Sequence, residues 1–157
     1  MSGIDFNDIA WMVLRAVYAW MFLYPLKSLL SDWPATVQAT ALLFPWQTRL
    51  FAVVSVAVMA LGALSILLGC YGQVGAAGLL AFCLGGAVIH YRLADLAKGA
   101  RLSGQASSAD RQAMAQVSKL GVVGHVTSAE KNFVLAAVAL FFLLKGTGPW
   151  SLCALKF

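Results

Sequence analysis

Charged residues are scarce in this chain of 157 residues. Only six are acidic and eleven basic, whereas 61% are hydrophobic and the mean hydropathy is +0.83. A soluble domain of this size needs a polar surface, which so few charges cannot supply. The composition excludes an ordinary soluble domain and predicts an integral membrane protein.

Several motifs are also missing. There is no P-loop, GxGxxG or GxSxG sequence, so phosphate-binding and acyl-transfer chemistry have no support. We expect His90 and His125 to be far apart, and His125 lies in a polar link, so we expect no metal site and disfavour haem ligation by His90 alone. We predict no catalytic residue, no cofactor bound by a motif, and no nucleic-acid binding, since the net charge of +5 is explained by membrane topology.

The apolar stretches that remain are continuous rather than alternating in polarity. Continuous stretches of about 20 residues favour helices over a membrane barrel. The sequence therefore predicts an all-α, integral membrane four-helix bundle, in which residues 1–157 form a single membrane domain. The expected elements are spans at about 8–26, 50–68, 74–91 and 128–144, and two long links at 27–49 and 92–127.

The links have contrasting character. Residues 69–72 read Gly-Cys-Tyr-Gly and predict a tight turn between antiparallel helices. The segment Ala35–Phe44 has Trp beside Pro at both ends and is too short to span, so we expect it at headgroup level. In the second link we expect a helix over Asp110–Leu120 that ends at Gly121, and a capping box at 127–130 that begins the last span.

The distribution of basic residues predicts the orientation. The two long links carry most of the Lys and Arg residues, so the positive-inside rule places them in the cytoplasm and both termini outside, in a bacterial inner membrane. Cys70 and Cys153 then share the external face, where an oxidising compartment permits a disulfide, although two cysteines without a CxxC spacing do not establish one. Cys83 lies mid-span and is interpreted as a packing residue.

Arg15 lies about 10 Å inside the first span, where an unpaired charge facing lipid is costly. Helical spacing places it on one stripe with Asp8, Trp11 and Tyr18. Two readings stay open. Arg15 either extends to the external headgroups and pairs with Asp8, or faces the bundle and binds an anionic group or a quinone-type carbonyl.

A second polar group is expected at the cytoplasmic end. Tyr24 and Lys27 end the first span there, His90 ends the third, and Glu130 begins the fourth. A carboxylate in a low-dielectric site usually has a cationic partner, so Glu130 is expected to pair with Lys27 or His90. The pair is either a salt bridge between helices or a proton-transfer or ligand site, in which His90 titrates near neutral pH.

Three fragments together make the chain resemble the DoxX family of small four-helix membrane proteins. They are Arg15 with Tyr24-Pro25-Leu26-Lys27, the run Leu67–Gln73 that leads to His90, and Glu130 with Gly146–Leu152. Tyr24, Gln73 and Cys153 depart from the residues common in that family. The resemblance implies a membrane subunit that accompanies redox enzymes, among them a thiosulfate:quinone oxidoreductase.

The leading functional hypothesis is a membrane-embedded subunit of a larger redox or respiratory-type complex that anchors partner subunits and lines a quinone or lipid site. An accessory role beside a quinone-linked oxidoreductase is expected rather than catalysis by this chain alone. The alternative is a purely structural or assembly subunit whose lipid-facing Phe133, Phe141 and Phe142 dock into a partner's helices. A small transporter ranks third, because no internal repeat or broken helix is visible.

Overall fold

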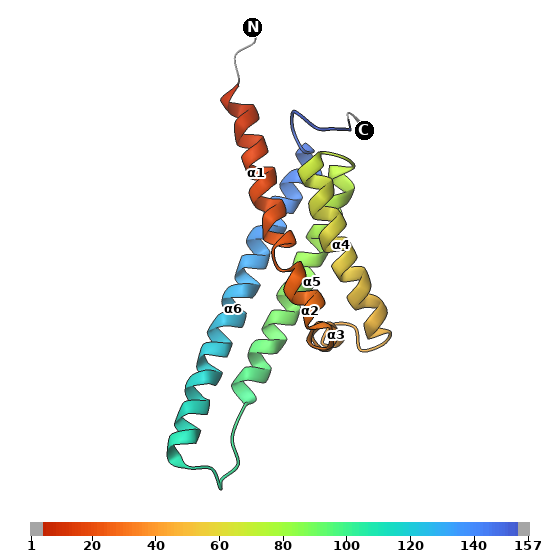
Figure 1. Cartoon of the computed structure of the whole chain (residues 1–157). Coiled ribbons are helices and arrows are strands. Elements are labelled where there is room, and N and C mark those ends of the chain that lie inside the picture. Colours follow the sequence, from red (N-terminus) through yellow and green to blue (C-terminus); the bar gives the residue numbers. More distant parts are fainter. Residues whose placement is uncertain (1–4, 154–157) are drawn as a thin grey trace.

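The structure is a computed structural model that describes residues 5–153, and it is helical without strands over that range. Four segments are long and apolar enough to cross a membrane, so the prediction of an all-α, four-helix integral membrane protein is confirmed. Figure 1 shows the six helices, which are α1 (Phe6–Leu23), α2 (Leu26–Ser31), α3 (Trp33–Ala41), α4 (Thr48–Leu68), α5 (Gly72–Gly99) and α6 (Ser108–Lys145).

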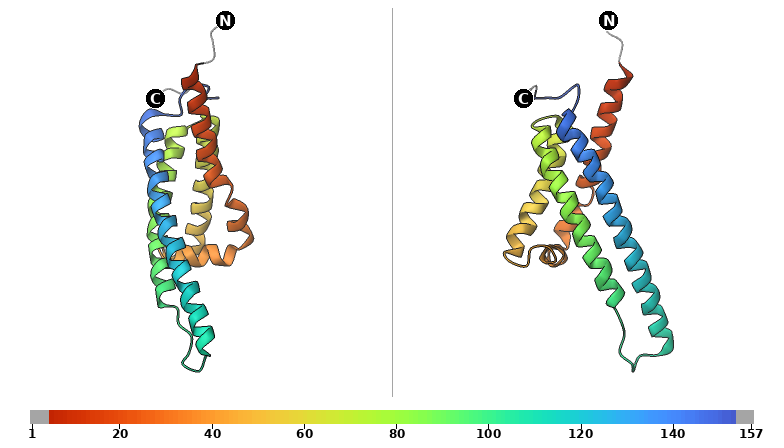
Figure 2. Two further views of the ribbon diagram at one scale, coloured as in Figure 1. Left: turned by 90° about the vertical axis from the view of Figure 1, so that its left-hand side faces the viewer. Right: turned by 180° about the vertical axis from the view of Figure 1, so that it is seen from behind.

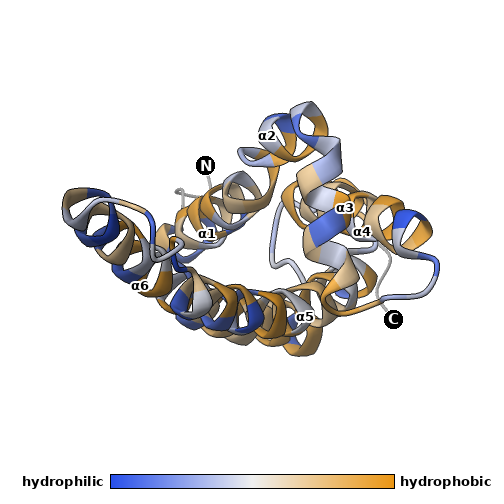
Figure 3. Cartoon of the chain, turned by 90° about the horizontal axis from the view of Figure 1, so that it is seen from below, coloured by the Kyte–Doolittle hydropathy of each residue, from blue (hydrophilic) through white to orange (hydrophobic). Residues whose placement is uncertain are grey.

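The two ends of the bundle differ. The start of α1, the α4–α5 turn and the end of α6 lie together at one end, which we name the capped end (Figures 1 and 2). At the other end, α5 and α6 continue past the rest of the molecule as a hairpin. We name its residues 92–124 the hairpin end. Seen along the bundle, α5 and α6 form one side, and α2 and α3 lie on the other (Figure 3).

The turn between α4 and α5 has the predicted position. α4 ends at Leu68, Gly69 has a φ of +70°, and α5 begins at Gly72. Small residues then bring the two helices close together. A Cβ added to Gly75 would lie 2.7 Å from the Cβ of Ser65, a separation that real side chains do not tolerate. The two helices are thus packed backbone to backbone.

The core lies between α1, α4, α5 and α6, outside the hairpin end. Phe142, Met59, Ile66, Leu79 and Cys83 are its largest fully buried side chains, so the packing role predicted for Cys83 is confirmed. The expectation that Phe142 faces lipid is wrong. α6 buries residues at intervals of three or four positions, from Ala129 to Phe142, and this spacing turns Phe142 inward.

The first span does not run straight to residue 26. α1 ends at Leu23, and Pro25 separates it from the short α2 because proline lacks an N–H and clashes with the preceding turn. α3 follows, capped by the Asp32 carboxylate, which accepts a hydrogen bond from the Ala35 N–H at 3.2 Å. It lies across the direction of α4 (Figure 2), consistent with a segment that does not cross.

The last two helices extend beyond the spans predicted within them. α5 continues to Gly99 instead of ending near 91, and α6 begins at Ser108, twenty residues before the expected start. The N-cap is Ser107, whose Oγ accepts a hydrogen bond from the Asp110 N–H at 3.1 Å. Thr127 is inside the helix, where its hydroxyl donates to the Val123 carbonyl at 3.0 Å, so the capping box does not form. Gly121 does not interrupt the helix either.

Candidate functional site

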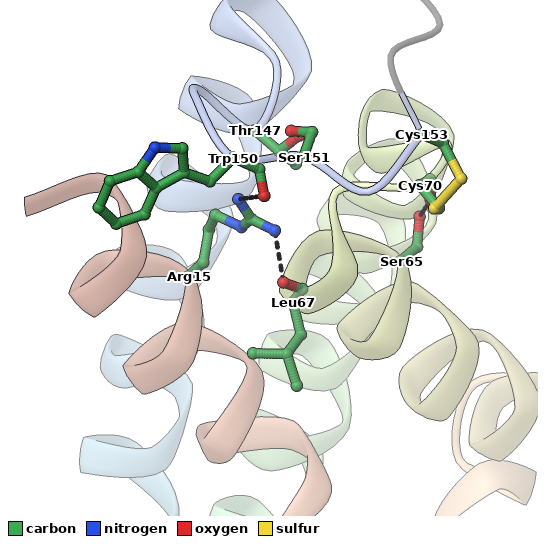
Figure 4. Close-up of a disulfide and its surroundings, with 8 residues drawn as sticks. All are labelled: Arg15, Ser65, Leu67, Cys70, Thr147, Trp150, Ser151 and Cys153. Atoms are coloured by element: carbon green, nitrogen blue, oxygen red, sulfur yellow. Dashed lines mark hydrogen bonds between the residues drawn. A yellow bond between two sulfur atoms is a disulfide. The ribbon is translucent and has the colours of Figure 1, made fainter. Parts of the chain in front are cut away.

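Arg15 lies at the capped end and is 96% buried, with a relative exposure of 4%. It projects from α1 toward the last turn of α4 and toward the chain that follows α6 (Figure 4). The residues beside it on α1, Tyr18 and Phe22, are also buried, which confirms that this stripe of the helix faces the bundle. Arg15 therefore points inward rather than toward lipid.

The guanidinium is held entirely by main-chain carbonyls. Its Nε donates to the Ile66 carbonyl at 2.9 Å, and Nη2 donates to the Leu67 carbonyl at 2.5 Å. Its Nη1 donates to the carbonyls of Pro149 at 3.1 Å and Trp150 at 3.5 Å. The last carbonyls of a helix have no partner within the helix and carry partial negative charge, so a cation placed there is stabilised. Arg15 thus joins the end of α4 to the segment that follows α6.

We name residues 146–153 the strap, because they fold back across the capped end. The Leu152 N–H donates to the Leu68 carbonyl at 3.0 Å, and a disulfide joins Cys153 to Cys70 in the α4–α5 turn (Figure 4). The Ser65 hydroxyl donates to the Cys70 carbonyl at 2.5 Å, which fixes that turn in place. The disulfide that the sequence permitted is therefore present in the structure.

The strap has a strained backbone. Gly146 and Gly148 have φ angles of +73° and +75°, which glycine adopts freely. Trp150 has a φ of +58°, which is rare for a bulky side chain and is retained only where surrounding contacts enforce it. The indole of Trp11 lies so close to Gly148 that any Cβ there would collide with it. Glycine at 148 is required for both reasons.

A shallow cavity of about 280 Å³ lies beside Arg15 and is open to the surroundings, since Trp150 and Leu152 in its wall are 52% and 76% exposed. Its walls are mostly apolar and come from α1, α4 and the strap: Met12, Arg15, Ala16, Leu67, Leu68, Trp150 and Leu152. Apolar walls with one polar anchor are typical of small-molecule sites. The strap provides one side of this cavity, so the position of the strap determines its shape.

The reading in which Arg15 extends to the headgroups and pairs with Asp8 is wrong. In the part of the chain that the structure describes, Arg15 makes no ion pair with Asp8, because the only salt bridge there joins the exposed Lys98 and Asp95 at 3.3 Å. The guanidinium faces the bundle, as the other reading expects, and four of its five N–H groups donate to main-chain carbonyls. It contributes to the structure of the capped end as the molecule stands.

The predicted cytoplasmic cluster does not assemble as expected. Tyr24, Lys27 and Glu130 are all exposed to the surroundings. Over residues 5–153, Glu130 forms no salt bridge with Lys27 or His90. Exposed long side chains gain little from pairing, and this accounts for the loose arrangement.

His90 pairs instead with His125, with 3.2 Å between their Nδ1 atoms. The expectation that these residues are far apart is wrong, because α6 begins early enough to carry His125 along α5. One ring can donate its Nδ1 proton to the other, which gives a hydrogen bond between two neutral imidazoles. Two imidazoles supply half of a tetrahedral metal site, and no group of three His, Cys, Asp or Glu residues forms within the described range. The geometry therefore fits a hydrogen bond linking α5 to α6.

Sequence reasoning missed three polar side chains that bridge helices. Tyr18 donates its hydroxyl to the Leu135 carbonyl at 2.9 Å, and Gln73 donates its Nε2 to the Leu143 carbonyl at 2.9 Å. Asn132 is buried against Gly86, where a Cβ would lie 2.8 Å from the amide nitrogen. A glycine facing a polar residue at matching depth is the signal that could have identified this last contact.

Comparison of the chain with protein-family models, curated proteins and solved structures finds no match.

Proposed function

We propose that the chain is a membrane-embedded accessory subunit of a larger redox assembly, with the hairpin end as its docking element for a partner subunit. The observation that supports this most directly is length. About 20 residues cross the hydrocarbon, but α5 has 28 residues and α6 has 38, and they rise about 42 Å and about 57 Å. With the capped end at one surface of the membrane, residues 92–124 project beyond the other.

The projecting part has an apolar surface. Val117 and Leu120 are 63% and 66% exposed, and they lie on one face of α6 at a spacing of three residues. Leu96 on α5 is exposed as well. Apolar side chains gathered outside the membrane favour a protein partner, since neither lipid nor the chain itself covers them.

The charge of the hairpin end identifies the chemistry of that partner. Residues 92–124 contain five basic and two acidic residues, so a partner with an acidic rim around an apolar centre fits it. The positive-inside rule places this end in the cytoplasm of a bacterial inner membrane. A disulfide at the opposite end agrees with that orientation, because disulfides persist in oxidising compartments.

The redox part of the proposal is supported by the resemblance to the DoxX family and by the Cys70–Cys153 disulfide at the capped end, which a dithiol can reduce. The described residues include no motif for a cofactor, so the electron-transfer chemistry is assigned to the partner. A quinone or a lipid is the ligand proposed for a site shared by this chain and its partner.

Purification from native membranes in mild detergent tests the assembly. We expect the chain to retain one defined partner that carries an absorbing redox cofactor, identified by mass spectrometry and absorption spectra. The variant Val117→Gln/Leu120→Gln should lose the partner and keep its fold. The matched control Gln112→Ala, at an exposed position of the same helix turned away from Val117, should retain it. A chain that elutes alone under all conditions would overturn the proposal.

A purely structural subunit is the second candidate, and the arrangement of Arg15 favours it. A guanidinium already bonded to four carbonyls has a structural role without any ligand. This candidate predicts that the partner carries no redox cofactor, and the spectra of the purified complex distinguish the two.

A further inference from the structure

The strap both forms one wall of the cavity beside Arg15 and carries the Cys153 end of the disulfide. We propose that the capped end contains a redox-gated binding site for an anionic amphiphile, closed while Cys70 and Cys153 are bonded and open after they are reduced. The inference goes beyond the proposed function and needs no partner subunit.

The first step concerns the anchor. Arg15 donates Nη1 to two strap carbonyls, those of Pro149 and Trp150, and donates its Nε and Nη2 to α4. Removing the strap would therefore free the Nη1 edge of the guanidinium and leave the side chain held in place by α4. A guanidinium with a fixed orientation and a free edge is a strong receptor for carboxylate or phosphate oxygens.

The second step concerns the ligand class. The walls that remain when the strap moves away come from α1 and α4, and apart from Arg15 they are all apolar: Met12, Ala16, Leu67 and Leu68. Such walls bind an alkyl chain and would not retain a small hydrated anion. The ligand is therefore an anionic head group that carries an acyl or alkyl tail.

The third step concerns the gate. Besides Arg15, the strap is held by the disulfide, by the Leu152–Leu68 hydrogen bond and by the packing of Gly148 against Trp11. It contains Trp150 in a left-handed conformation, which is unfavourable for tryptophan. Once the disulfide is broken, opening of the strap relieves this strain and increases the conformational entropy of the chain. Both effects favour the open state.

The redox step is a thiol–disulfide exchange with a dithiol. One thiolate of the dithiol attacks a sulfur of the Cys70–Cys153 bond and forms a mixed disulfide, and its second thiol then displaces the protein sulfur. Cys70 and Cys153 together receive two electrons and two protons, and the dithiol becomes a disulfide. No metal or further oxidant takes part.

Strap and ligand compete for the same guanidinium edge, so binding and reduction are linked. A ligand that binds only the open state must favour reduction by the same factor by which reduction favours binding. We expect n-dodecyl phosphate to bind the reduced protein about tenfold more tightly than the oxidised protein, within the usual range of such coupling.

The experiment uses the full chain in a nonionic detergent, oxidised or treated with dithiothreitol, together with Cys70→Ser/Cys153→Ser. Binding of n-dodecyl phosphate is measured by titration calorimetry, with inorganic phosphate and dodecanol as probes of the head group and the chain alone. The reduced protein and the double variant should bind the amphiphile equally well and bind the two controls far more weakly. Cys83→Ala keeps the disulfide and should keep the redox response.

A second measurement does not depend on how well any variant folds. Phenylglyoxal modifies accessible guanidinium groups, and peptide mass spectrometry reports the modification of Arg15 in the wild-type chain. Modification should rise at least several-fold on reduction and fall again when n-dodecyl phosphate is added. Equal affinity in both redox states, or equal modification of Arg15, would overturn the proposal.

Discussion

The two ends of the molecule are built on opposite principles. At the capped end, a buried guanidinium, a disulfide and a strained strap fasten α1, α4 and the end of the chain to one another. At the hairpin end, α5 and α6 project as a pair, with exposed apolar side chains and an exposed salt bridge between Lys98 and Asp95. At the capped end the buried polar groups are bonded within the chain. At the hairpin end apolar side chains remain exposed.

The difference shows where stability and association reside in this chain. Contacts at the capped end are between buried groups, whose loss leaves carbonyls or charge without partners. Most side chains at the hairpin end are exposed, so substitutions there should change binding to the proposed partner more than folding.

Replacing Arg15 by methionine should have the largest effect on stability. The variant keeps an apolar stem but leaves four carbonyls at the capped end without their donor, and we expect a loss of about 3–5 kcal/mol in the free energy of unfolding. Unfolding by SDS in mixed micelles measures it. Arg49→Met, at an exposed position on α4, is the control. If the two variants lose similar stability, the structural role of Arg15 is wrong.

Removing the disulfide should have the next largest effect. Cys70→Ser/Cys153→Ser opens a link between positions 83 residues apart and should cost about 2–4 kcal/mol, mainly by freeing the unfolded chain. The same unfolding assay applies, with reduced wild-type protein as the matched control. Reduced and substituted proteins should agree, and a variant as stable as the oxidised chain would contradict the prediction.

Two glycines contrast the packed and projecting regions directly. Gly75→Ala places a Cβ 2.7 Å from Ser65 and should cost about 1–3 kcal/mol. Gly124→Ala, where nothing lies within 4 Å, should instead stabilise α6 by up to about 1 kcal/mol because alanine favours helix. Thermal unfolding of both variants gives the comparison. A loss of stability in Gly124→Ala would show that the hairpin is packed more tightly there than the structure indicates.

The smallest effect distinguishes the true start of α6 from the expected one. Ser107→Ala removes a helix cap and should cost about 1 kcal/mol, measured as reduced helicity and faster proteolysis of the hairpin end. Thr127→Ala removes only a bond inside the helix and should change stability by less than about 0.5 kcal/mol. The reverse order would support a separate helix that begins at residue 127.

Much of the fold follows from the sequence because a helix that crosses the bilayer needs about 20 apolar residues, which a hydropathy profile reveals. The four spans and the turn at residues 69–72 were predictable on this basis. The long extension of α6 was not, because its N-terminal half is polar enough to read as a link. Neither Gly121 nor Gly124 breaks it, since a neighbouring helix supports that stretch: the Ser118 hydroxyl donates to the Ala97 carbonyl at 2.5 Å.

The pairing of His90 with His125 depended on that extension. Ala97 lies seven residues after His90, and Ser118 lies seven residues before His125, so both pairs follow one antiparallel register. The sequence indicated the end of one helix at Gly121 and the start of the next at Thr127, so this register could not be predicted.

The hydrogen-bond partners of Arg15 could not be predicted from the sequence, for a different reason. Its acceptors are main-chain carbonyls, which every residue possesses, so no side-chain pattern identifies them. The sequence indicated that a buried arginine must be compensated, but only the fold shows which carbonyls compensate it.

The disulfide at the capped end also has a consequence for biosynthesis. Cys153 follows the last helix, and Cys70 lies between the second and third long apolar helices, so the bond can close only after α6 has been inserted and has brought the chain end to the same side of the membrane. A chain whose final helix fails to cross leaves both thiols free. The oxidised bond therefore marks a chain whose last helix has been inserted.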